Sequence, residues 1–425
     1  MRYLIFALVI SCQVFFENDL LAQSIIGHTP ISRFGLGQTL GYGLTRNDGL
    51  AGCGLAAPHS DHPNLMNPAL LSFNRKVNLD FDLRYSFRTL SWPNTPDYQT
   101  GSGSPAQLSF IIPINKRLST AFGVRPHSAR DFVFYQKEFQ GIDSLGFKNR
   151  GLGGVTQFWL AAGYELNRTI SVGLETSYLL GTLEDSVTFG VLPKNLNFEF
   201  ISIYKRKVSQ IVFKPGIHLR FPVGAKKSSY LAFGATADIG DRINFREYRT
   251  FTIKGVGDQK DTLQNGNASN LRRPITYSYG LSLFNPEVGS LSAEFDWVQA
   301  PGQTDENSVM KNHNAIAVRI GGEYMIGTKK STRYWNIITF RGGLSYQQLP
   351  FQQNGKFVTD KKVTFGLSFP IIRKEAKFSR PLINLAVAYG QRGLKDSTVG
   401  IENYWQVTLG FTLNDFLWFN RYRID

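Results

Sequence analysis

The feature that most constrains this chain is a hydrophobic pattern with a period of two, which recurs in fourteen segments of about ten residues. Within residues 77–88, apolar side chains such as Leu79 and Phe81 alternate with polar ones such as Asp80 and Asp82. Successive side chains of a strand point to opposite faces, so each segment predicts a strand with one apolar and one polar face. The connections between segments alternate between short and long. An even number of such strands with unequal turns is the sequence pattern of a transmembrane β-barrel.

We therefore expect an all-β fold, a 14-stranded antiparallel transmembrane β-barrel over residues 77–414, with a tail at 415–425. Short turns face the periplasm in outer-membrane barrels, so both termini and the tail are expected on that side. The long connections, including 127–154, 182–207 and 240–274, are expected outside the cell. The predicted strands are 77–88, 106–114, 118–126, 155–166, 170–181, 208–221, 229–239, 275–284, 290–298, 315–326, 335–347, 361–371, 382–390 and 404–413.

The first 22 residues predict a secretory signal peptide. Arg2 provides its positive end, residues 4–16 its apolar run, and Ala22 a small residue at its end. An alternative is a lipoprotein cleavage site at Cys12. An exported chain without a long apolar helix segment is expected in the bacterial outer membrane, where a closed barrel satisfies the backbone in lipid. A soluble β-sandwich, the alternative fold, would not explain strands of such uniform length.

The net charge of +15 is concentrated in the expected periplasmic turns. One interpretation is attraction to anionic lipid head groups. The other is an acidic periplasmic or outer-membrane protein partner that docks there. Nucleic acid is not expected as a partner in this compartment. The basic turn residues are Lys116, Arg117, Arg168, Lys226, Lys227, Lys329, Lys330, Arg333, Arg373, Lys374, Lys377 and Arg380.

The polar faces of the strands predict residues that line the lumen: His218, Arg319, Glu323 and Arg341. The last three fall on adjacent strands, and two interpretations remain open for them. They could form a ladder of ion pairs that stiffens the barrel, or they could line a path for a solute.

Candidate catalytic and metal-binding patterns are weak. The segment from His59 to His62, with Asp61 between them, is the densest group of possible ligands, but no second group completes a metal site. No Gly-x-Ser-x-Gly elbow is present, and the His residues are scattered. We therefore expect no enzyme activity, no catalytic residue, no metal and no cofactor.

Residues 23–76 do not alternate, and they end in an Asn67-Pro68-Ala69 element just before the first strand. Such a segment ahead of fourteen strands resembles the long-chain fatty-acid transporter (FadL-like) superfamily. Residues 31–37 and 409–419 look like its Bacteroidetes members. The resemblance implies that residues 23–76 form a hatch inside the lumen, held in part by Asn67, Pro68 and Ala69. It also implies passive transport of hydrophobic, fatty-acid-like small molecules, with contact to outer-membrane lipid.

In this superfamily the molecules leave sideways, through an opening in the wall where a strand is kinked beside the hatch. Gly123 and Pro126 are the candidates for that kink, because proline cannot donate to a strand ladder. Pro215-Gly216 is the rival position. The same superfamily includes barrels of type IX secretion, so a non-enzymatic subunit of a secretion or assembly complex is the alternative function.

Overall fold

The computed structural model describes residues 26–415, except 42, 60–61, 94, 141–142, 193–198, 225–227, 241, 255–258, 301–310, 328–332, 372–380, 396 and 398. The predicted basic turns at 225–227, 328–332 and 372–380, the signal peptide and the tail after residue 415 thus lie outside the described residues. Among the described residues, no helix has the length and apolar character needed to cross a membrane.

Fourteen antiparallel strands form a closed barrel, which confirms the predicted fold class. Closure is made by β18 and β2, which pair from Ile401↔Ser91 to Asp415↔Val77. Each predicted segment overlaps one of these strands. The strands are β2 (Val77–Ser91), β3 (Tyr98–Pro113), β4 (Leu118–Gln140), β5 (Asp143–Glu165), β6 (Ile170–Leu192), β7 (Glu199–Val223), β8 (Ser229–Asp238), β11 (Ile275–Asn285), β12 (Gly289–Gln299), β14 (Ala315–Met325), β15 (Thr339–Gln353), β16 (Lys356–Pro370), β17 (Leu382–Leu394) and β18 (Gly400–Asp415).

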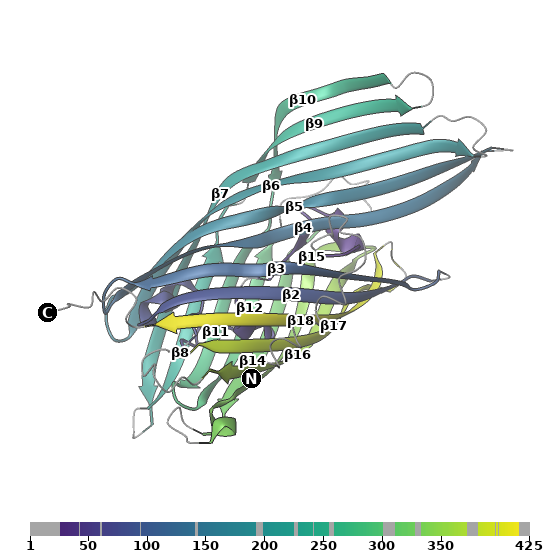
Figure 1. The fold of residues 1–425 in the computed structure, drawn as a ribbon. Helices are drawn as coiled ribbons and strands as arrows, with labels where there is room; N and C mark the ends of the chain where they lie inside the picture. Colours follow the sequence, from purple (N-terminus) through teal and green to yellow (C-terminus); the bar gives the residue numbers. More distant parts are fainter. Residues whose placement is uncertain are drawn as a thin grey trace, which may run out of the picture.

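Several predicted long connections are strand rather than loop. β4 to β7 run on well beyond the ten or so residues that a membrane requires, and they project past the rest of the barrel (Figure 1). An added hairpin, β9 (Arg242–Lys254) and β10 (Gln259–Arg272), extends this sheet, because β9 pairs with the outer half of β7. The prediction missed these extensions because strands that leave the lipid no longer need a continuous apolar face.

The two faces of the wall have opposite character. Outward-facing residues such as Leu160, Ile320 and Leu344 are 60%, 52% and 61% exposed, whereas inward-facing Glu175 and Arg341 are both 2% exposed. The strand predicted at 335–347 begins later than expected. The 3-10 turn η3 (Tyr334–Ile337) precedes β15, and Ile338, which alternation would place on the lipid face, is 1% exposed.

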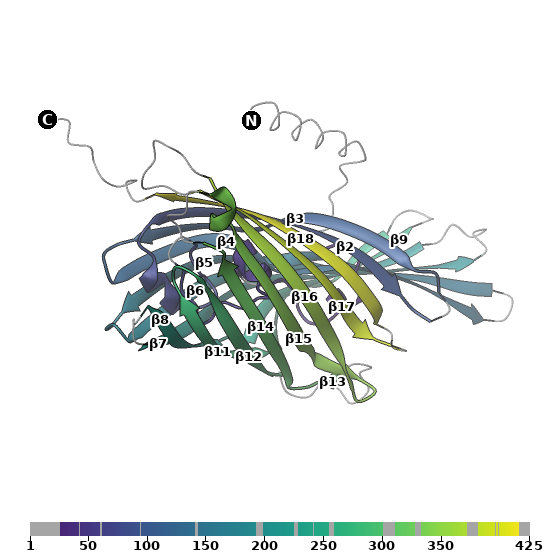
Figure 2. The same cartoon turned by 90° about the horizontal axis from the view of Figure 1, so that it is seen from below.

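Residues 26–76, which we call the lumenal segment, lie inside the barrel (Figure 2). Their short elements are η1 (Pro30–Arg33), β1 (Gln38–Thr39), α2 (Thr45–Asp48) and η2 (Pro68–Phe73). Leu44, Leu65 and Leu71 of this segment pack into a buried cluster with Ile111 and Trp159 of the wall. The outer face of the barrel wall exposes its apolar side chains. The buried apolar clusters therefore lie between the lumenal segment and the inner face of the wall. A two-residue strand, β13 (Lys311–Asn312), pairs with β15.

Candidate functional site

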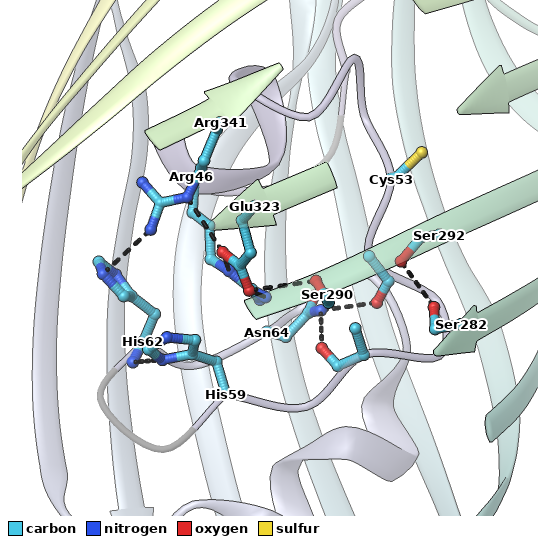
Figure 3. A network of polar contacts seen from close by, with 12 residues as sticks. Arg46, Cys53, His59, His62, Asn64, Ser282, Ser290, Ser292, Glu323 and Arg341 are labelled. Carbon is cyan, nitrogen blue, oxygen red and sulfur yellow. Dashed lines mark hydrogen bonds and ion pairs between the residues drawn. The ribbon is translucent and has the colours of Figure 1, made fainter. Parts of the chain in front are cut away.

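A buried ion-pair network fastens α2 to the barrel wall (Figure 3). Arg46 donates from Nε and Nη2 to the two carboxylate oxygens of Glu323, at 3.1 and 2.6 Å. Arg341, directly opposite Glu323 in the β14–β15 pairing, donates to the same carboxylate at 3.2 Å. One carboxylate thus holds two guanidinium groups that are almost completely out of solvent. Losing it would leave both buried charges uncompensated.

His62 completes this network from the lumenal segment. Its Nε2 lies 3.1 Å from Ser368 Oγ and 3.4 Å from Arg341 Nη2. Burial, together with the charge of Arg341, holds the pKa of His62 well below its ordinary value, so the ring is neutral. His59 accepts a hydrogen bond from the His62 backbone N–H at 3.1 Å, while residues 60 and 61 lie outside the described residues. Within the described part of the chain, no three His, Cys, Asp or Glu side chains form a group that could hold a metal ion.

A second carboxylate holds the turn after α2. Glu294 Oε1 accepts hydrogen bonds from the backbone N–H groups of Gly54 and Leu55, both at 2.6 Å. Arg319 reaches Asp296 at 2.7 Å and Glu294 at 3.5 Å. Arg319 therefore balances two carboxylates on the neighbouring strand, while Glu323 and Arg341 belong to the Arg46 network.

The Asn67-Pro68-Ala69 element lies against the inner face of β5, β6 and β7. Asn67 Oδ1 accepts the Ala69 N–H at 3.0 Å and so caps η2, and its amide nitrogen donates to Ile217 O at 3.0 Å. This close approach requires a glycine in the wall, since a Cβ at Gly216 would lie 2.2 Å from Asn67 Oδ1. His218, on the same strand, is fully buried and bonds to Ala56 O at 3.0 Å.

The wall is incomplete between β3 and β4. These strands pair only from Leu108↔Val124 to Pro113↔Ser119, although both continue well beyond that point. Gly123 is the second-last residue of β4 to pair with β3, and the register with β5 is interrupted between Pro126 and Ser128. Past this point, β3 pairs with β2 and β4 with β5, and their facing edges separate. At the rival position, Pro215-Gly216, the pairing with β6 continues without a shift, while the pairing with β8 stops at Gly216 and is followed by a single bridge from Phe213 to Ile239.

Residues 26–40 of the lumenal segment occupy the separated edge of β4. The short strand β1 pairs there, with Gln38 opposite Ala129. Thr29 N–H donates to Asp131 O at 2.8 Å and Leu40 N–H to His127 O at 3.0 Å. Backbone groups that would otherwise lack a strand partner are thereby satisfied.

Arg130 adds side-chain bonds along the same edge. It donates to the carbonyl oxygens of Ser32, Arg33 and Gly35 at 3.2, 2.6 and 3.2 Å. On the other side of the gap, Gly27 lies so close to β3 that a Cβ there would be 2.9 Å from Thr100 Oγ1. The lumenal segment therefore fills the gap that the two strands leave.

A cavity of about 570 Å³ lies beside this gap. Part of its lining is apolar, from Ile26, Ile31, Phe34 and Leu36 of the lumenal segment. The wall contributes charged groups, among them Arg84, Arg88, Lys214, Asp296, Lys362 and Arg392. A ligand with both an apolar body and a polar head matches this division.

The predicted lumen and kink residues are thus distributed over four places. Glu323 and Arg341 come together, Arg319 pairs on the next strand, His218 supports residue 56, and Gly123 and Pro126 lie at the β3–β4 gap. Sequence reasoning missed Arg46 and Arg130, and it placed Glu294 on an inward face without assigning it a contact to the lumenal segment. The sequence did contain a signal for each of them. Arg46 is a charged residue in a segment with no strand pattern, Glu294 lies in the predicted strand 290–298, and Arg130 follows the predicted strand 118–126 by four positions.

The wall and the segment inside it define a 14-stranded antiparallel β-barrel with an occupied lumen. The chain belongs to the BamG family, whose family model matches residues 4–425. A comparison with curated proteins finds no match.

Solved structures share the fold at low identity. A FadL homologue from Pseudomonas aeruginosa is 12% identical over 89% of this chain and 100% of its own, with a TM-score of 0.57. The toluene transporter TbuX from Ralstonia pickettii is 13% identical over 88% of this chain and 98% of its own, with a TM-score of 0.52. The toluene transporter TodX from Pseudomonas putida is 13% identical over 90% of this chain and 100% of its own, with a TM-score of 0.50.

Proposed function

We propose that the protein is a passive outer-membrane channel for hydrophobic small molecules with a polar head, which leave sideways between β3 and β4. In this proposal the short turns and both termini face the periplasm, and the long hairpins face outside. The observation that carries it is the gap in the wall between β3 and β4. The lumenal segment, rather than strand pairing, fills this gap. At the gap, residues 26–40 are held to β4 by hydrogen bonds, and breaking them can open the wall without unfolding the barrel.

An apolar path toward the gap supports the substrate class. Four half-buried aromatic rings, Phe147, Phe189, Phe200 and Phe251, lie across β5, β6, β7 and β9, with successive centroids 6.0, 4.7 and 6.1 Å apart. By strand alternation, Phe189 is on the same face as the buried Leu183, which packs with Leu36 of the lumenal segment. The relatives described as toluene transporters are consistent with an apolar cargo.

The test is a disulfide between β1 and β4, from Gln38→Cys and Ala129→Cys. Opposed residues of an antiparallel pair have Cα atoms about 4.5–5.5 Å apart, which suits a disulfide. In vesicles that contain the protein, we expect oxidation to abolish most uptake of a fluorescent long-chain fatty acid and of toluene, and reduction to restore it. A control disulfide from Gln391→Cys and Asn403→Cys joins two strands that already pair, and should change nothing. Undiminished uptake through the oxidised Gln38–Ala129 variant would refute the lateral exit.

One observation favours a second function, a non-enzymatic subunit of a secretion or assembly complex. Buried ion pairs fasten the lumenal segment at several points of the wall, including Arg46–Glu323, Arg88–Glu402 with Thr29, and Asp48–Arg84. A segment that moves for every solute needs less fastening than this. Purification in mild detergent separates the two functions. A partner protein at equal amount, with no uptake in vesicles, would support the complex subunit.

A further inference from the structure

The outer face of β7 changes character abruptly along its length. Phe213 and Ile211 are 46% and 51% exposed, as expected for side chains in lipid, and they are followed by Ser209, Lys207 and Lys205. At the boundary, the hydroxyl groups of Tyr178 and Ser209 lie 2.7 Å apart. Tyrosine is enriched at membrane interfaces because its ring is apolar and its hydroxyl polar. The edge of the hydrocarbon layer therefore falls near Ser209.

Three basic residues lie together on the same face just beyond this edge: Lys205, Lys207 and Arg246. We call them the outer basic patch. The neighbouring residues of β9, Ile243 and Phe245, are buried on the inner side, so Arg246 points outward. Lys207 lies four positions along the strand from Ile211. At a tilt near 45°, this places Lys207 about 9 Å above that last apolar side chain. That is the depth of lipid head groups.

The charges of the patch are balanced only in part by the protein. Lys207 lies directly opposite Arg246, an arrangement in which Cβ atoms are about 4.5–5.5 Å apart and like charges repel. Of the three, Lys205 alone has an acidic partner among the described residues, Glu184 at 2.9 Å. Lys207 instead lies 4.9 Å above the ring of Tyr248, which fixes its ammonium in place. Two cations held directly opposite each other repel, and an external anion bound between them would remove this repulsion.

We propose that the outer basic patch binds a phosphate group of a glycolipid in the outer leaflet. A guanidinium binds phosphate through two parallel hydrogen bonds, and an ammonium adds a compact positive charge. The apolar row of Ile211 and Phe213 below the patch would contact the acyl chains of the same lipid. The assignment to the outer leaflet rests on the proposed orientation, with the long hairpins outside. The phosphate chemistry does not depend on the transport function.

The test measures lipid binding to the purified protein in non-ionic detergent by native mass spectrometry. The probes are phosphorylated lipid A, the same lipid A stripped of phosphate, and phosphatidylglycerol. We expect stoichiometric binding of phosphorylated lipid A, and at least tenfold weaker binding by the double variant Lys207→Gln/Arg246→Gln. The control double variant Lys254→Gln/Lys260→Gln removes the same charge from the far end of the hairpin and should bind as the wild type does.

Equal binding of lipid A with and without phosphate would overturn the proposal, as would undiminished binding by Lys207→Gln/Arg246→Gln. Equal binding of phosphatidylglycerol would overturn the choice of a glycolipid. Heat-modifiable mobility in gels verifies that each variant keeps its barrel. Labelling of Lys254→Cys on intact cells tests the orientation separately, since an inaccessible residue would refute the orientation while the phosphate measurement stands on its own.

Discussion

Among single residues, Glu323 contributes most visibly to holding the lumenal segment in the barrel. It accepts from Arg46 of α2 and from Arg341 of β15, and all three side chains are almost fully buried. Cys53 is close by along the chain and has 0% exposure, so its thiol reports whether the segment is seated. Removal of the Glu323 carboxylate should therefore change the accessibility of the Cys53 thiol.

We expect Glu323→Gln to destabilise the seated segment by about 3–5 kcal/mol, because two buried cations lose their counter-charge. The measurement is labelling of Cys53 by a water-soluble maleimide, followed by mass spectrometry of its peptide, and labelling should be much faster in the variant. Glu184→Gln is the matched control. Its ion pair with Lys205 is solvent-exposed and contributes about 0–1 kcal/mol. Equally slow labelling in both variants would show that the Glu323 network does not hold the segment.

At the scale of elements, the β9–β10 hairpin is an addition to the barrel rather than a part of its closure. β8 and β11, which flank it in the chain, pair directly from Thr276↔Asp238 to Phe284↔Tyr230. Among the described residues, the hairpin pairs with the outer half of β7 and with no other wall strand, and it supplies Ile243 and Phe245 to the cluster around Leu36. Its role is therefore local to the outer end of the molecule.

Replacing residues 242–272 by a short Gly-Ser linker should leave the barrel assembled, since every wall strand keeps its neighbours. Heat-modifiable gel mobility and circular dichroism measure this. Removal of the β11–β12 hairpin, residues 275–299, is the contrasting deletion and should prevent closure. If the first deletion also prevents assembly, the hairpin has a part in folding that its pairing does not indicate.

At the scale of the whole molecule, the barrel has its apolar side outside and its polar side inside, the reverse of a soluble protein. On β14, Ile320 is 52% exposed, while Ala317 and Glu323 on the inner face are 2% and 7% exposed. Outward apolar side chains of this kind are stable only in lipid.

A cysteine at Ile320 should react with an apolar, membrane-restricted maleimide in vesicles, because its side chain meets acyl chains. A cysteine at Ala317, on the inner face, should stay unlabelled by the same probe. Quenching by lipid-linked nitroxides of a fluorophore at each position provides the second measurement. The reverse order of reactivity would contradict the placement of the two faces.

The sequence by itself determined the fold class and the number of wall strands. A period of two over ten residues depends only on local alternation between two solvents, so residues such as Leu160 and Ile320 can be assigned to the lipid face without knowing their neighbours. It also pointed to Gly123 and Pro126, since a glycine and a proline that disrupt a ladder are visible in one strand alone.

The tertiary structure decided what fills the barrel. Residues 26–76 have no period, so nothing local indicates that Arg46 meets Glu323, that Glu294 holds the turn at residue 54, or that residues 26–40 lie along β4. The same holds for the facing charges of Lys207 and Arg246, which lie far apart in the chain and become neighbours only through the register of β7 and β9. These contacts join distant parts of the sequence, and their energies depend on burial that only the closed barrel creates.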